Sequence, residues 1–381
     1  DDPDFDINKA RLFTTVPRIC VRYECIPMRF IKHVYKIHTY RQEGRLFEGK
    51  TPASAFLNSS YDGSFIAGLM ELRYIQSLPV ERIINYFEGY GFTLKKPTAH
   101  KLIEKASSLF ENLYKCIRQT ALSDPYKAAD ETYYKILVPE KNSKGKGVRK
   151  GYLWVVVGIN TRMIYLLYDD GSRSERVILN ELGSCKGIIQ SDGYSPYRKL
   201  ESDAYPHITR IPCLQHIKRK FIDCGEKDPD AKRIVELINA LYQNEHKHKV
   251  EVEGWTVEQN LMHRKKYALD ILGEIKDVLD EIEERGDLLP KSELQEAITY
   301  LRNEWNAVVD IFNYGDTYLD NNMVERMNRY ISLSRKNSLF FGSHKGAERG
   351  AILYTIALTC RMHKVNLFEY LTDVINRTAE W

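Results

Sequence analysis

The chain has 381 residues, of which 43% are hydrophobic and 28% are charged, so it can form a globular protein with a large apolar core. Its net charge is only +4, so any affinity for nucleic acid must come from local clusters of cations. No apolar run of about 18 residues occurs, which predicts no membrane span and no membrane partner. The seven cysteines are scattered and the N-terminus does not resemble a signal peptide. Both features predict reduced thiols in an intracellular, cytoplasmic protein.

Residues 1–60 are predicted to form a small β-rich N-terminal segment. Two stretches, Val21–Ile26 and Phe30–Ile37, partly alternate apolar and polar residues, as strands do. Cys20 and Cys25 could be half of a zinc site, but no second cysteine pair follows at zinc-like spacing. We therefore expect a structural sheet here and no zinc.

Residues 61–123 are predicted to form a helical domain of three helices, the third starting at Pro97. A glycine-containing turn between short helices is typical of a helix-turn-helix module. Lys95, Lys96 and Lys101 stand at the start of the third helix, where a recognition helix meets DNA. The alternative is a plain helical bundle with a solvated basic face.

Residues 124–224 change from helical to strand-like periodicity, and we interpret them as the first part of a catalytic core. The predicted order is three strands, a helix, a strand, a helix and a strand, which is the order of a ribonuclease-H-like mixed sheet. In that arrangement the first and fourth strands are neighbours, which would bring Asp130 and Asp192 together. The predicted strands are Asp130–Val138, Tyr152–Ile159, Met163–Tyr168, Lys186–Ser191 and His207–Ile211, and the first helix is Ser172–Leu182.

The rest of the chain is predicted to be helical. The interval between Asp192 and Glu325 is too long for a simple connection, so residues 225–315 are interpreted as a helical insertion domain. Residues 316–343 then return to the core with the glutamate helix, and 344–381 form C-terminal helices. The predicted class is α+β with an α/β core.

Three acidic residues in this order can form a two-metal phosphoryl-transfer site. Asp130 and Asp192 are placed on strands and Glu325 near the start of a helix. Mg²⁺ prefers carboxylate oxygens, and two ions can activate the attacking oxygen and neutralise the leaving one. We therefore expect all three residues to be catalytic and to bind two Mg²⁺ ions, for which Mn²⁺ can substitute. Singly, Asp130 could be a surface carboxylate, Asp192 a turn residue and Glu325 a capping-box residue.

Two further groups of cations are predicted to contact DNA. One lies in a glycine-containing hairpin loop and the other follows Glu325, where cations could hold phosphates beside the reacting bond. The alternative for the second group is a solvated helix end favoured by the helix dipole. The residues are Lys144, Lys146, Lys150, Arg326, Arg329, Arg335 and Lys336.

Two other features each have a functional and a structural interpretation. Cys213 and His216 form a C-x-x-H half-site, but no second pair follows at zinc-like spacing, so packing beneath the core is favoured over a metal. Trp255 lies in the insertion, where it could stack on a flipped base, but a core position is the more common use of tryptophan.

Five segments resemble the insertion sequence 66 family of DDE transposases: Asp130–Thr132, Ser191–Tyr194, Cys213–Phe221, Asp320–Arg326 and Arg335–Ser343. The resemblance covers roughly residues 60–375 and is most specific over 320–350. It implies a ribonuclease-H-like core, an acidic triad of Asp130, Asp192 and Glu325, and Mg²⁺. The family's N-terminal zinc-binding cysteine pairs are not matched here.

The resemblance implies a prokaryotic, nucleoid-associated protein that binds the terminal inverted repeats of its own element, cleaves them and joins them to target DNA. The implied partners are both DNAs, a second copy of the chain in a homodimer or larger assembly, and accessory proteins of the same element. One alternative is a non-catalytic DNA-binding regulator descended from a transposase. The other is a ribonuclease-H-like nuclease without strand transfer.

Overall fold

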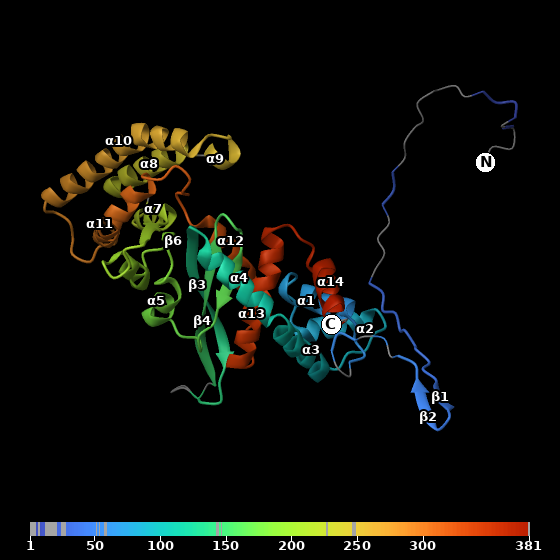
Figure 1. Cartoon of the computed structure of the whole chain (residues 1–381). Coiled ribbons are helices and arrows are strands. Elements are labelled where there is room, and N and C mark those ends of the chain that lie inside the picture. The colour runs from blue at the N-terminus through green and yellow to red at the C-terminus, as the bar shows by residue number, and fades with distance from the viewer. Residues whose placement is uncertain are drawn as a thin grey trace.

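A computed structural model gives the fold of this protein (Figure 1). It describes residues 5–6, 8–11, 21–23, 28–50, 52, 54–56, 59–141, 145, 147–225, 228–245 and 249–379. Within these ranges, no helix combines the length and the apolar run that a membrane crossing requires. The predicted zinc half-site of Cys20 and Cys25 lies outside the described residues.

The centre of the molecule is a mixed sheet with the strand order β5-β4-β3-β6-β7. The first three strands in the chain form an antiparallel meander, while β6 and β7 run parallel to β3. The predicted adjacency of the first and fourth strands is therefore confirmed. The strands are β3 (Tyr126–Leu137), β4 (Val148–Gly158), β5 (Ile164–Leu167), β6 (Gly187–Ser191) and β7 (Ile208–Pro212).

Gly187 allows β6 to start close to β3. Its φ is +91°, a conformation that favours glycine, and an added Cβ would lie 2.2 Å from the carbonyl oxygen of Pro125. The Ile188 amide donates to that same oxygen at 2.8 Å, which starts the parallel pairing. The register then pairs Ala128 with Gln190.

Helices pack against the sheet and cover its β5 edge. Thr355 and Thr359 of α13 bond the β5 backbone: the Leu166 amide donates to Thr355 Oγ1, and Thr359 Oγ1 donates to the Ile164 carbonyl, both at 2.9 Å. An edge strand satisfied in this way cannot pair with another chain. The elements that pack on the sheet are α4 (Glu111–Ser123) on β4 and β5, α12 (Asn322–Asn337) on β3 and β4, and α13 (His344–Met362) on β5. Helix α5 (Glu175–Leu182) packs against the short α6 (Ser195–Arg198), which is followed by the 3-10 turn η1 (Lys199–Glu201) on β7.

Residues 63–123 form four helices rather than the three predicted, because the third predicted helix is divided at Phe110. Phe110 is buried and has non-helical backbone angles, so the chain turns there. The part before it packs on α1 and α13, while the part after it packs on the sheet. The helices are α1 (Gly63–Tyr74), α2 (Val80–Gly89), α3 (Lys96–Leu109) and α4.

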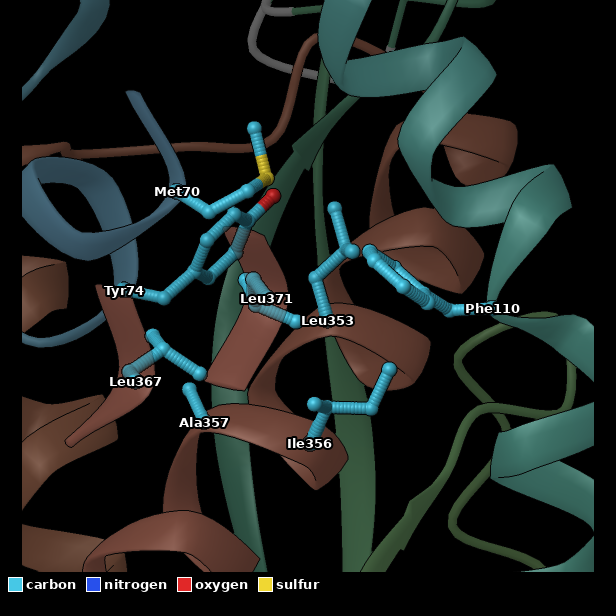
Figure 2. Close-up of a pocket in the computed structure, with 8 residues that line it drawn as sticks. All are labelled: Met70, Tyr74, Phe110, Leu353, Ile356, Ala357, Leu367 and Leu371. Atoms are coloured by element: carbon cyan, nitrogen blue, oxygen red, sulfur yellow. The ribbon is translucent and has the colours of Figure 1, made fainter. Parts of the chain in front are cut away.

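The C-terminal helix α14 (Leu367–Ala379) packs along α1. Figure 2 shows the small apolar cavity where α1, α13, α14 and the α3–α4 junction meet, lined by residues such as Met70, Tyr74, Phe110 and Leu371. The Tyr74 hydroxyl is the polar group among these otherwise apolar lining residues. The cavity is therefore part of a hydrophobic core that joins the N-terminal helices to the C-terminal ones.

The predicted helical stretch after β7 is present, and it lies on the opposite side of the sheet from α1–α3 (Figure 1). Apolar stripes pair α8 with α10 and α7 with α11. Trp255 is half-buried, with the Lys249 ammonium 4.9 Å from its ring centre, so its interpretation as a core residue is wrong. The helices are α7 (Leu214–Asp223), α8 (Pro229–Asn244), α9 (Lys249–Val252), α10 (Val257–Glu284) and α11 (Glu293–Ile311).

The N-terminal segment contains a β-hairpin, β1 (Thr39–Gln42) with β2 (Arg45–Glu48), which projects from the body (Figure 1). The predicted strand over Phe30–Ile37 is wrong, because the described backbone there pairs with no strand. Ile31 and Val34 are exposed, while Phe30 stacks on Phe92 of the helical region. The alternation of apolar and polar residues in this stretch is not enough to form a sheet without a partner strand.

Candidate active site

Asp130 lies on β3, and Asp192 directly follows β6, which is the parallel neighbour of β3 in the sheet. Ala128 of β3 pairs with Gln190 of β6, and continuing this register by two residues places Asp130 beside Asp192. The negative charge of Asp192 adds to burial and to Glu131 in raising the pKa of Asp130. The topology thus brings the two predicted aspartates together.

Asp130 is half-buried and lies against α12. Burial, followed by the charges of Glu131 and Asp192, raises its pKa from the ordinary 3.8 to about 8. Two hydrogen bonds oppose this effect: the Glu131 amide donates to Oδ1 at 2.8 Å, and Asn328 Nδ2 donates to Oδ2 at 2.5 Å. A desolvated carboxyl near two other acids is a good ligand for a cation, which would relieve the repulsion.

Glu131 is held by partners of its own. Arg173 donates to Glu131 Oε1 from Nε at 3.0 Å and Nη2 at 2.5 Å, and the Tyr197 hydroxyl lies 3.3 Å from Oε2. Burial raises the pKa of Glu131, and the charge of Asp192 contributes to this effect. Glu131 is therefore a salt-bridged acid that interacts with both aspartates.

Helix α12 presents Glu325 and Asn328, which lie three residues apart on one face. Asn321 caps this helix, so Glu325 occupies the fourth helical position and the capping-box alternative is wrong. Met327 and Asn328 are buried, and Met323 and Tyr330 are half-buried against the core. Met323, Met327 and Tyr330 all line a surface groove.

Cys213 and His216, from the start of α7, lie against Glu325. Cys213 Sγ is 3.9 Å and His216 Nδ1 is 3.6 Å from Glu325 Oε1. Burial raises the pKa of the Cys213 thiol to about 12. The Asn321 amide donates to Cys213 Sγ at 3.3 Å, and Asn321 Nδ2 donates to the Ala129 carbonyl at 3.0 Å. One asparagine thus ties the start of α12 to both α7 and β3.

The turn that carries Asp192 is held by a buried network. Arg210 of β7, fully buried, donates to the Asp192 carbonyl at 2.7 Å and to Glu304 Oε2 at 2.6 Å, both from Nη2. The Tyr300 hydroxyl accepts from the Gly193 amide at 2.9 Å. Tyr300 and Glu304 both belong to α11, so the insertion contacts the site directly. This network could not be predicted from the sequence, because no local pattern connects α11 with β6.

The predicted cations after Glu325 fall into two groups. Arg326 and Arg329 line a groove along α12, together with Arg361, whose guanidinium lies 4.0 Å from the ring centre of Tyr330. Lys364 and Arg162 line the same groove. The groove therefore combines several cations with an aromatic ring, and Asp320 is the acidic residue in its lining.

The second group surrounds Tyr133 of β3. Arg335 lies 3.9 Å and Lys150 lies 4.5 Å from its ring centre, and Arg335 Nη1 also donates to the Tyr133 carbonyl at 2.5 Å. Lys336 is exposed nearby on α12. Lys144 and Lys146 of the predicted hairpin loop lie outside the described residues.

The remaining predicted DNA contacts lie on the exposed side of α3. Lys95, Lys96 and Lys101 are exposed, while Ala99 and Leu102 face the core. Lys96 Nζ is 2.6 Å from Glu81 of α2, so this ammonium is already paired. In Figure 1, α2 and α3 lie away from the insertion helices, across the sheet.

Comparison with known proteins places the chain among the transposases. The family described as "Transposase IS66 family" matches residues 58–349, and the chain therefore belongs to this family. Three curated relatives from Sinorhizobium fredii (strain NBRC 101917 / NGR234) are named uncharacterized proteins y4jD, y4hP and y4qI. They are 26%, 25% and 25% identical over 88%, 94% and 94% of this chain. The chain spans 66%, 67% and 68% of their lengths. Family membership suggests an enzyme of nucleic acid metabolism that interacts with DNA.

Proposed function

We propose that the protein is a DDE transposase that cuts its element's ends and joins them to target DNA at one acidic site. The observation that carries the proposal is the convergence of Asp130 and Asp192 at neighbouring parallel strands, with the Glu325 helix packed on β3. The strand order, with three antiparallel strands followed by two parallel ones, is what a ribonuclease-H-like core requires.

The acidic residues fit a magnesium centre. Burial, together with the neighbouring acids Glu131 and Asp192, raises the pKa of Asp130, and hard carboxylate oxygens are the ligands that Mg²⁺ prefers. Asp130, Asp192 and Glu325 would hold two ions, which Mn²⁺ can replace. When bound, these ions supply Lewis-acid stabilisation and a more nucleophilic oxygen.

The protein's own residues hold the site and the DNA. Asn328 fixes the orientation of the Asp130 carboxylate, while Arg210 and Tyr300 fix the Asp192 turn. In the first transfer, water displaces the 3′ oxygen of the transposon end from phosphorus. In the second, that freed 3′-hydroxyl attacks a target phosphodiester and displaces its 3′ oxygen.

The α12 groove is suited to the DNA strand that leads into the site. Arg329 follows Glu325 by one helical turn, so it lies on the same side of α12 as the acidic residues. Arginines bind phosphate oxygens, and Tyr330 offers a ring on which a base can stack. The exposed lysines of α3 would bind the terminal repeats at a second place, with a further protomer and element-encoded accessory proteins completing the assembly.

The two alternative functions, a DNA-binding regulator and a plain nuclease, predict different products from the same DNA. A regulator would bind labelled end DNA without cutting it, and a plain nuclease would nick it without joining it to a plasmid target. We expect wild-type protein with Mg²⁺ to give the joined product, and Asp192→Asn to bind end DNA but neither nick nor join it. Binding alone by the wild-type protein would favour the regulator.

A further inference from the structure

We propose that Cys213, His216 and Glu325 form a zinc-type metal site, separate in its chemistry from the magnesium centre. Their donor atoms all lie within 4.8 Å of one another. Thiolate, imidazole and carboxylate together are a ligand set that Zn²⁺ favours and Mg²⁺ does not. The inference rests on the proposed function only through Glu325, which both sites share.

The spacing of His216 Nδ1 and Glu325 Oε1 suits a shared ion better than a direct hydrogen bond, while Cys213 Sγ makes a long sulfur hydrogen bond to the same oxygen. The separations to Glu325 Oε1 are 3.9 Å from Cys213 Sγ and 3.6 Å from His216 Nδ1. Hydrogen bonds from nitrogen to oxygen are about 2.7–3.2 Å long. Around a tetrahedral Zn²⁺ with bonds of about 2.0–2.3 Å, neighbouring ligand atoms are about 3.3–3.8 Å apart. The observed separations are close to the edges of such a tetrahedron.

His216 Nδ1 provides a second, independent observation. It is shielded from solvent and has no hydrogen-bond partner among the residues that the structure describes. A buried polar atom without a partner is destabilising, and a bound ion would satisfy it. The Cys213 thiol would release its proton to solvent when it coordinates the ion.

The site would join α7 to α12 at the first turn of the glutamate helix. Three protein ligands leave one position of a tetrahedral ion open to water, as in other zinc sites that are not purely structural. The ion would contact Oε1 of Glu325, leaving Oε2 for the acidic centre. It would thereby fix the direction of the Glu325 side chain.

The sequence alone did not predict this site, because C-x-x-H has no second pair at zinc-like spacing. The completing ligand is Glu325, which comes from another helix far along the chain and meets the pair only through the packing of α7 and α12. Tertiary structure, rather than a local motif, assembles the site.

The test is a titration of the metal-stripped full chain with Co²⁺, without DNA or Mg²⁺. Co²⁺ replaces Zn²⁺ and gives a near-ultraviolet charge-transfer band when a thiolate is a ligand. We expect one Co²⁺ per chain with this band, loss of the band in Cys213→Ser, and at least tenfold weaker binding in His216→Ala and in Glu325→Gln. Zn²⁺ should abolish the band, and excess Mg²⁺ should not.

Control variants separate this site from the other cysteines. The double variant Cys20→Ser/Cys25→Ser and the exposed-site variant Cys116→Ser should keep the band. Circular dichroism checks folding, and the near-isosteric Glu325→Gln provides a test if Cys213→Ser fails to fold. A wild-type protein without the band, or a band unchanged in Glu325→Gln, would overturn the metal site. Intact DNA joining in a protein that lacks the band would leave the proposed function standing.

Discussion

Removing the Tyr300 hydroxyl tests whether the insertion positions Asp192. In Tyr300→Phe the Gly193 amide loses its acceptor at 2.9 Å, and both residues are half-buried. Leaving a buried amide unpaired costs about 1–3 kcal/mol, so urea unfolding should show a loss near the lower end of that range. Residues that orient metal ligands change metal affinity or activity by about 10–100-fold when they are replaced. We therefore expect the Mg²⁺ concentration for half-maximal cleavage to rise by about that factor.

The assay is Mg²⁺-dependent cleavage of labelled end DNA, measured beside DNA binding without metal. Binding should not change, because Tyr300 acts through the Asp192 turn. The matched control is Tyr267→Phe, at an exposed tyrosine of α10 in the same insertion, which should behave as wild type. A wild-type Mg²⁺ dependence in Tyr300→Phe would refute the idea that α11 positions the aspartate. Gly193→Ala should also be impaired, since its Cβ would lie 2.4 Å from the Tyr300 hydroxyl oxygen.

Glu304→Ala leaves Arg210 buried with Glu201 as its remaining carboxylate, so unfolding experiments should show a loss approaching about 3 kcal/mol, and no loss would contradict the network. The raised pKa of Asp130 means that between pH about 4 and about 8 the folded chain keeps a proton that the unfolded chain has lost. The stability of the metal-free protein should therefore fall as pH rises through this window, and Asp130→Asn should flatten the fall in pH-dependent urea melts. The double variant Arg326→Gln/Arg329→Gln should reduce the slope of log affinity for DNA against log salt concentration by about 0.9 per lost phosphate contact. An unchanged slope would show that the groove does not contact DNA.

Much of the core could be predicted because its signals are local. The strands of the sheet and the helical stretch after β7 show in periodicity, and the adjacency of β3 and β6 followed from element order. The sequence places Asp130 and Asp192 at or just after buried strands, and the structure brings these two residues together through the pairing of β3 with β6. Glu325 was chosen for its place on a helix after a long interval, and the catalytic role of all three residues stays a prediction.

What the sequence could not predict depends on tertiary packing. The helix predicted to start at Pro97 is interrupted at Phe110, because the chain turns there from one packing surface to another. The helical spacing of apolar residues continues through this position, so the sequence does not reveal the interruption. Asn328 lies one turn after Glu325, and its hydrogen bond to Asp130 forms only because α12 packs on β3. Tyr300 and Glu304 reach the Asp192 turn from α11, and nothing in their local sequence indicates that contact.

The most direct test of the acidic site is a strand-transfer assay with labelled terminal-repeat DNA, a supercoiled plasmid target and Mg²⁺. We expect joined products from the wild-type protein. We expect none from Asp130→Asn, Asp192→Asn or Glu325→Gln, while each variant still binds end DNA. Joined products from any of these variants at the wild-type level would contradict the assignment of the acidic site.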